Sequence, residues 1–298
     1  MNARLAALEG LVPPMITPLT PEGEIDRNDL ERLVNHLLDS GVSGLFILGT
    51  SGEGPWLTSR QSEALMRYTV EAVNGRVPVL AGVLEPSTPR TIEAIKRAVD
   101  CGVDTVVVTT PYYMEADASV QRYHLEQAAQ ISPLPVLLYN IPSKTHNILA
   151  PQTVREVLHI TNIIGIKDSA GDWQAFEALL ALRHERPTFK IFQGAEQLSA
   201  RSLAAGADGV VPGLGNLVPV LFVEMIKNIK AGNVAAATAL QEQVDWIGRL
   251  HTYGYWLACL KYAVSLSGLC SDVTCGQNGT LNETSKQAIR DLVTKHGV

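Results

Sequence analysis

The sequence repeats one pattern eight times, a short apolar run followed by a helix-forming segment, with a period of about 25 residues. The apolar runs lie at residues 12–17, 44–49, 77–83, 105–110, 135–138, 163–166, 189–192 and 209–211. Strict alternation of strand and helix predicts parallel strands joined by right-handed crossovers. Eight such units within ~220 residues fit a closed (β/α)8 TIM barrel, which is the α/β fold that we predict.

The main alternative is an open, doubly wound sheet. Such a sheet usually has a GxGxxG motif after its first strand, and this sequence has none there. We expect residues 1–230 to form the barrel, with the active site. Residues 231–298 show helical patterns without strand alternation, and we expect them to form a C-terminal helical extension packed on the barrel.

Composition and charge exclude several classes of protein. Apolar residues make up 46% and charged residues 18% of the chain, which is enough for a large core and argues against disorder. The net charge of -6 does not favour binding to nucleic acid, and no apolar run is long enough to span a membrane. We see no signal peptide, and the four cysteines lack a CxxC spacing, so we expect a cytoplasmic protein with free thiols.

The sixth apolar run, residues 163–166, is followed directly by Lys167. Removing an ammonium group from water favours the neutral amine, and a neutral amine is a nucleophile towards carbonyl carbons. Lys167 is therefore a candidate for Schiff-base catalysis. The alternative is that Lys167 extends to solvent or pairs with a carboxylate, as most lysines do.

Polar side chains also follow other predicted strands, whose carboxyl ends meet at the catalytic face of a TIM barrel. Thr50 and Ser51 follow the second run, Tyr113 the fourth and Tyr139 the fifth. A tyrosine hydroxyl can transfer protons, and small hydroxyls can bind a carboxylate, so this set suits carbonyl chemistry. The alternative for Tyr113 and Tyr139 is a role as core or interface aromatics.

The histidines do not form a metal-binding pattern, because no HxH, HxxxH or HExxH spacing occurs. His146, just after the fifth predicted strand, is the one histidine to test as a ligand, and its alternative is an ordinary loop residue. We expect no metal and no cofactor other than the covalent imine on Lys167.

Residues 49–54 form a glycine-rich loop, Gly-Thr-Ser-Gly-Glu-Gly. The simplest explanation is that the glycines adopt positive φ angles. The alternative is a nest of N–H groups that binds an anion. A nucleotide-binding P-loop is excluded because GxxxxGK[ST] is absent.

Four motifs occur in order along the chain: GTSGE at 49–53, TPYY at 110–113, YNIP at 139–142 and GIKDSAGD at 165–172. With these motifs the chain resembles the dihydrodipicolinate synthase / N-acetylneuraminate lyase family over nearly its whole length. The resemblance implies a class I, pyruvate-dependent lyase or synthase on a TIM barrel, assembled as a homotetramer (a dimer of dimers).

The resemblance also implies a role for each matching residue. Lys167 would form the Schiff base with pyruvate or another 2-keto acid. Tyr139 would carry protons near the imine, and Thr50 would link to Tyr139 through its hydroxyl. Thr50 and Ser51 would bind the carboxylate of pyruvate, and Tyr113 would reach into the site of a neighbouring subunit.

Two further residues are expected to bind substrate: Lys144, shortly after YNIP, and Val211, in the eighth run. The synthases of this family carry an arginine where this chain has Lys144, and lysine lacks the bidentate fork of a guanidinium group. We therefore expect cleavage of a 2-keto-3-deoxy sugar acid to pyruvate and an aldehyde.

Three alternatives stay open at this stage. The first is a 4-hydroxy-tetrahydrodipicolinate synthase, which condenses pyruvate with aspartate semialdehyde. The second is a barrel that binds a keto acid without turnover, which the fold does not exclude. The third concerns Lys144 alone, which could be an ordinary exposed loop lysine.

Overall fold

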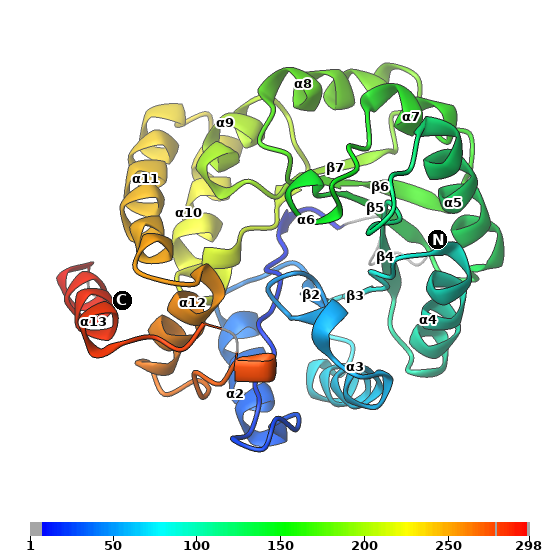
Figure 1. The fold of residues 1–298 in the computed structure, drawn as a ribbon. Helices are drawn as coiled ribbons and strands as arrows, with labels where there is room; N and C mark the ends of the chain where they lie inside the picture. Colours follow the sequence, from blue (N-terminus) through cyan, green and yellow to red (C-terminus); the bar gives the residue numbers. More distant parts are fainter. Residues whose placement is uncertain (1–7, 278, 297–298) are drawn as a thin grey trace.

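The computed structural model describes residues 8–277 and 279–296 and shows a barrel of parallel strands surrounded by helices (Figure 1). The strands are β1 Gly10–Leu11, β2 Leu45–Ile47, β3 Val79–Gly82, β4 Thr105–Thr109, β5 Val136–Asn140, β6 Ile163–Asp168, β7 Lys190–Gln193 and β8 Gly209–Val210. Neighbouring strands pair in the order β1-β8-β7-β6-β5-β4-β3-β2, all parallel. The predicted (β/α)8 fold is confirmed.

The barrel closes between the segment after β1 and β2. Pro14 forms an isolated parallel bridge with Phe46. The N–H of Phe46 donates to the carbonyl of Pro13 over 3.1 Å, and the N–H of Met15 donates to the carbonyl of Phe46 over 2.9 Å. The regular part of the first strand, β1, therefore lies just before residues 12–17, where we predicted it. The reason is that the prolines at 13 and 14 cannot donate ladder hydrogen bonds.

The outer helices are α2 Arg27–Asp39, α3 Ser59–Val73, α4 Thr88–Asp100, α5 Ala118–Ile131, α7 Pro151–Glu156, α8 Trp173–Ala181, α9 Ser199–Ala204 and α10 Pro219–Lys230. Thr58 and Gln61 form a capping box at the start of α3. A short helix that we did not predict, α6 Pro142–Thr145, follows β5 directly. It carries Lys144, so it places that side chain near the mouth of the barrel.

Side chains alternate between two apolar layers, as the period of two in a strand requires. On β5, Val136 and Leu138 belong to the outer cluster between sheet and helices, whereas Leu137 and Tyr139 belong to the cluster inside the barrel. The inner cluster consists of Leu8, Val12, Phe46, Leu80, Leu84, Val107, Leu137, Tyr139, Ile141, Phe192 and Val211. Large side chains thus fill the barrel below its carboxyl end.

Residues beyond α10 form α11 Val234–Ile247, α12 Trp256–Ser265 and α13 Glu283–His296. Their apolar residues, among them Ala237, Val244 and Leu260, belong to the same core cluster as the outer face of the barrel. The boundary near residue 230 stays a prediction. None of the helices in the described part of the chain is long and apolar enough to cross a membrane.

His124 on α5 gives a testable consequence of burial. Its ring is buried, its Nδ1 lies 2.9 Å from the hydroxyl of Thr88, and burial lowers its pKa to about 4. The pKa in the unfolded chain is about 6.5, so the folded state resists protonation. The stability is therefore complete above pH 6.5 and falls as the pH drops from 6.5 towards 4, by about 2 kcal/mol at pH 4.5.

The substitution His124→Asn removes this titrating group and keeps a polar atom for Thr88. We expect the free energy of unfolding of the variant to depend less on pH between 7 and 4.5 than that of the wild type, by about 2 kcal/mol. Urea denaturation at the two pH values measures the difference. Equal pH dependence in both proteins would contradict the assignment.

Candidate active site

Lys167 points into the barrel from β6. Its neighbour Ile166 packs in the outer cluster, so the alternation along the strand turns Lys167 inward. The side chain is buried, with its Nζ 4.1 Å from the centre of the Tyr139 ring and 5.0 Å from the centre of the Phe46 ring. The Lys167 ammonium thus sits against the faces of two aromatic rings.

This position can be compared with the two ordinary roles of a lysine, extension to solvent and pairing with a carboxylate. Lys167 is 3% exposed, so it does not extend to solvent. None of the ion pairs found among the described residues includes Lys167. An amine held in an apolar wall without a carboxylate partner is the environment that favours nucleophilic use of a lysine.

Tyr139 and Thr50 lie beside this amine. The register pairs the Cα of Tyr139 on β5 with the Cα of Lys167 on β6, so the two side chains enter the barrel at the same height. The Tyr139 hydroxyl lies 3.2 Å from the Thr50 hydroxyl, within hydrogen-bond distance. Phe46 packs edge-on against the Tyr139 ring, with centroids 6.0 Å apart. Three residues predicted from separate strand ends are therefore brought together.

The glycines of residues 49–54 are required for space and not for positive φ, which corrects our expectation. The positive φ angles in this region fall on Leu48 and Glu53 instead. A Cβ at Gly54 would lie 2.0 Å from the carbonyl oxygen of Leu48, and a Cβ at Gly52 would lie 2.9 Å from the carbonyl oxygen of Met15. The loop is folded too tightly against the barrel for side chains at these positions.

Gly194 after β7 leaves space for the side chains of Ser169 and Lys167. A Cβ at this position would lie 2.0 Å from the hydroxyl oxygen of Ser169 and 2.8 Å from Cε of Lys167. The glycine therefore leaves room for the lysine side chain. The sequence alone did not indicate this steric role.

Asn140 and Asp168 form a buried pair directly behind the site, and sequence reasoning missed it. The side-chain amide N–H of Asn140 donates to Oδ1 of Asp168 over 2.6 Å. The side-chain oxygen of Asn140, Oδ1, accepts from the backbone N–H of Leu149 over 3.0 Å. Burial raises the pKa of Asp168, and the hydrogen bond from Asn140 opposes that rise. The signal was available, because Asn140 follows Tyr139 and Asp168 follows Lys167 on paired strands.

A cavity of about 280 Å³ opens above Thr50. Its lining residues are Thr50, Glu53, Pro55, Trp56, Leu84, Thr109, Tyr112, Ile141, Lys144, Thr145, Tyr255, Trp256 and Leu257. Lys144 is exposed at this cavity, with its Nζ 5.9 Å from the centre of the Trp256 ring. Residues 255–257, at the start of α12, contribute to the wall, so the C-terminal extension takes part in forming the cavity.

The other predicted residues fall into two groups. Ser51 is buried in the loop next to Thr50, and Val211 is buried in the inner cluster with Tyr139. Tyr113 is 89% exposed, has a positive φ of 75° and does not line the cavity, whereas Tyr112 does.

His146 ends α6 in a left-handed conformation and is exposed. Across the described residues, no group of three or more His, Cys, Asp or Glu side chains could hold a metal ion. The expectation that the reaction needs no metal stays a prediction.

Barrel, buried lysine and adjoining phenol together define a class of protein, a TIM barrel with an amine placed for carbonyl chemistry. The model of the dihydrodipicolinate synthetase family matches residues 7–296, and the chain belongs to this family. The protein is thus a lyase of the class I aldolase type. The alternative of a barrel that binds a keto acid without turnover is set aside.

Curated relatives support this placement. The chain is 36% identical to the 4-hydroxy-tetrahydrodipicolinate synthase of Bacillus velezensis, over 86% of this chain and 88% of that protein. It is 37% identical to the protein of the same name from Xylella fastidiosa, over 77% of this chain and 76% of that protein.

Solved structures agree with the fold. A prophage protein of the dihydrodipicolinic acid synthase family from E. coli K12, solved in complex with pyruvate, superposes with a TM-score of 0.93 at 29% identity, covering 97% of this chain and 98% of that chain. The dihydrodipicolinate synthase of Bacteroides thetaiotaomicron gives a TM-score of 0.92 at 31% identity, covering 97% and 98%.

The Asn140–Asp168 pair yields a prediction about stability. In Asn140→Leu, the Asp168 carboxylate loses its side-chain donor, so its pKa rises further and we expect a loss of about 2 kcal/mol at pH 8. A carboxyl group with a raised folded-state pKa loses stability as the pH rises through that pKa, so the loss should be smaller at pH 5. Denaturant unfolding at both pH values measures it. A loss of equal size at pH 5 and pH 8 would show that Asp168 ionisation is not the cause.

Proposed function

We propose that the protein forms a Schiff base between Lys167 and pyruvate and then condenses the product with an aldehyde, as a 4-hydroxy-tetrahydrodipicolinate synthase does with aspartate semialdehyde. The observation that carries the proposal is the buried Lys167 amine, 4.1 Å from the Tyr139 ring, whose hydroxyl lies 3.2 Å from that of Thr50. Relatives that carry this name, at 36% and 37% identity, support the choice of acceptor.

The chemistry proceeds from the arrangement of these side chains. The neutral Lys167 amine attacks the keto carbon of pyruvate, and loss of water from the adduct leaves a protonated imine. Tyr139, linked to Thr50, supplies and removes the protons of these steps. The imine withdraws electrons, so the methyl carbon loses a proton and becomes an enamine nucleophile that attacks the aldehyde carbon. Hydrolysis then releases the product and restores Lys167.

Binding of the pyruvate carboxylate falls to the loop at Thr50 and Ser51. Both residues precede the tight turn at Gly52, and the Ser51 side chain is buried at the wall of the barrel. Small hydroxyls and backbone N–H groups in such a turn can hold a carboxylate next to the amine. Val211, buried beside Tyr139 in the inner cluster, would form the apolar floor below the substrate.

Tyr113 enters this proposal through assembly. It is exposed beside Met114, which is also exposed, so one chain leaves two large apolar side chains in solvent near the site. We infer a homotetramer in which Tyr113 reaches the site of a neighbouring subunit. This arrangement would account for a left-handed tyrosine that contributes nothing to its own cavity.

Reductive trapping tests the first half of the reaction. With pyruvate and borohydride, we expect a stable adduct on the peptide that contains Lys167, because reduction fixes the imine carbon on Nζ. Lys167→Arg keeps the positive charge but cannot form the imine, and should give no adduct. Lys227→Arg, an exposed position on α10, should be trapped as the wild type is. An unmodified Lys167 peptide in the wild type, measured by mass spectrometry, would refute the proposal.

The second candidate is cleavage of a 2-keto-3-deoxy sugar acid, and one observation favours it. Lys144, two positions after YNIP, has its Nζ over Trp256 in the cavity, whereas a guanidinium group would hold a far carboxylate with two hydrogen bonds. Both candidates share the imine on Lys167. They differ only in the aldehyde that the cavity accepts.

An acceptor assay separates the two candidates. We expect condensation of pyruvate with aspartate semialdehyde in a coupled assay, and we expect Lys144→Arg to raise kcat/KM for this acceptor about tenfold, because it adds a bidentate contact. A matched assay for pyruvate release from 2-keto-3-deoxy sugar acids covers the other candidate. Activity only in the second assay, unchanged or lowered by Lys144→Arg, would favour the aldolase.

A further inference from the structure

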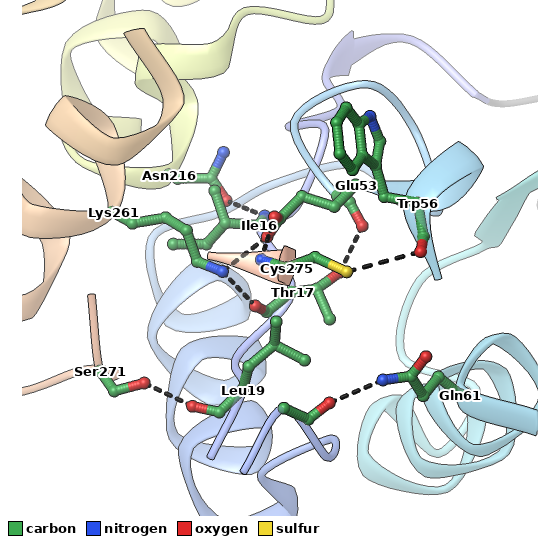
Figure 2. A network of polar contacts seen from close by, with 12 residues as sticks. Ile16, Thr17, Leu19, Glu53, Trp56, Gln61, Asn216, Lys261, Ser271 and Cys275 are labelled. Atoms are coloured by element: carbon green, nitrogen blue, oxygen red, sulfur yellow. Dashed lines mark hydrogen bonds and ion pairs between the residues drawn. The ribbon is translucent and has the colours of Figure 1, made fainter. Parts of the chain in front are cut away.

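A buried ion pair lies on the far side of the Thr50 loop. The carboxylate of Glu53 accepts from Nζ of Lys261 over 2.6 Å, and both side chains are buried, at 4% and 0% exposure (Figure 2). Lys261 is on α12, in the C-terminal extension, and Glu53 ends the GTSGE motif. The proposed chemistry does not use either residue.

The pair is hydrogen-bonded to two further groups, so its polar atoms are well satisfied. Lys261 also donates to the carbonyl oxygen of Thr17 over 2.8 Å, and the second carboxylate oxygen of Glu53 accepts from the N–H of Cys275 over 2.6 Å. The Thr17 hydroxyl donates to the carbonyl oxygen of Gly52 over 2.5 Å. Lys261 and Thr17 together therefore hold two consecutive residues of the loop, Glu53 and Gly52.

Backbone hydrogen bonds connect Glu53 to Thr50. The N–H of Glu53 donates to the carbonyl oxygen of Thr50 over 3.2 Å, and the N–H of Gly54 donates to that of Gly49 over 3.1 Å, so Thr50 and Glu53 belong to one turn. Glu53 has a φ of 58°, a conformation that is unfavourable for a residue with a side chain. Such a conformation persists only where its surroundings fix it, and the ion pair provides that fixation.

We propose that Glu53 and Lys261 are a positioning pair, which sets the Thr50 hydroxyl against Tyr139 and so makes the C-terminal extension part of the proton-transfer machinery. The inference rests on the proposed Schiff-base function. It adds that a residue on α12 controls the rate of imine and enamine formation without touching substrate. Lys261 neither lines the cavity nor contacts Tyr139 or Lys167 through any hydrogen bond found among the described residues.

The competing explanation is that the pair contributes only to stability. A buried ion pair is weak support for that view, because desolvation of two charges offsets much of their attraction. The two explanations differ in what happens when both charges are removed together. A double variant, Lys261→Met with Glu53→Gln, has no unpaired buried charge, so its stability should return. Its methionine side chain still cannot donate a hydrogen bond to the carbonyl oxygen of Thr17 or to the side chain at position 53.

The test compares the full-length wild type with Lys261→Met, Glu53→Gln, the double variant, and Lys261→Arg. Lys227→Met, which breaks an exposed pair with Glu224, is the matched control. The measurements are the thermal midpoint and the rate of borohydride-trapped adduct formation with pyruvate, per folded molecule, across pH. Saturating and limiting pyruvate separate kcat from KM.

We expect Lys261→Met to lower both the thermal midpoint and the trapping rate, the rate by on the order of a hundredfold, as a misplaced catalytic group does. The double variant should regain the midpoint but not the rate, and the lost rate should persist at saturating pyruvate because the Thr50 hydroxyl is no longer held against Tyr139. Lys261→Arg should recover part of the rate, and Lys227→Met should match the wild type.

Two results would overturn the inference. One is a double variant that regains both midpoint and rate, which would make the role structural only. The other is a Lys261→Met protein whose folded fraction reacts as fast as the wild type. Absence of any adduct in the wild type is a different failure, since it would refute the Schiff-base function on which the inference rests.

Discussion

An amine inside an apolar barrel is the constraint on which the rest of the site depends. Lys167 is buried against the rings of Phe46 and Tyr139, and no carboxylate in the described part of the chain forms an ion pair with it. The desolvated ammonium is costly, and the ring faces offset part of that cost. The same surroundings constrain the neighbouring positions, because a Cβ at Gly194 would lie too close to Ser169 and to Cε of Lys167. The Lys167 amine is thereby held in place beside the Tyr139 ring.

Two buried carboxylates near the site have polar partners other than Lys167. Asp168 is buried one residue after Lys167, but it points to the other face of β6 and binds Asn140. Glu53 is buried in the loop, but its charge is met by Lys261. Both of these carboxylates are therefore satisfied elsewhere, which keeps Lys167 from forming an ordinary ion pair with them. The polar frame around the barrel is thus a condition for the chemistry at its centre.

The fold was predictable because it is repeated, whereas the supporting contacts were not because they join distant segments. The alternation of apolar runs predicts parallel strands, and strand ends predict that Lys167, Tyr139 and Thr50 converge. Lys261 lies in α12, where residues 257–264 are all buried, and nothing local indicates that it meets Glu53, 208 positions earlier. Because of the two prolines, the first regular strand lies earlier in the chain than we predicted. The glycines of residues 49–54 are explained by close steric contacts and not by positive φ angles.

The wall formed by residues 255–257 has a consequence for the evolution of substrate choice. These residues come from outside the eightfold repeat, so their side chains take part in none of the strand pairing that builds the barrel. Changes there can reshape the cavity proposed for the aldehyde while the proposed imine chemistry at Lys167 stays intact. In the proposed reaction, imine formation therefore depends on the barrel, whereas the choice of aldehyde depends on residues that can vary. A fold of this kind can acquire new partners for pyruvate without rebuilding its catalytic centre.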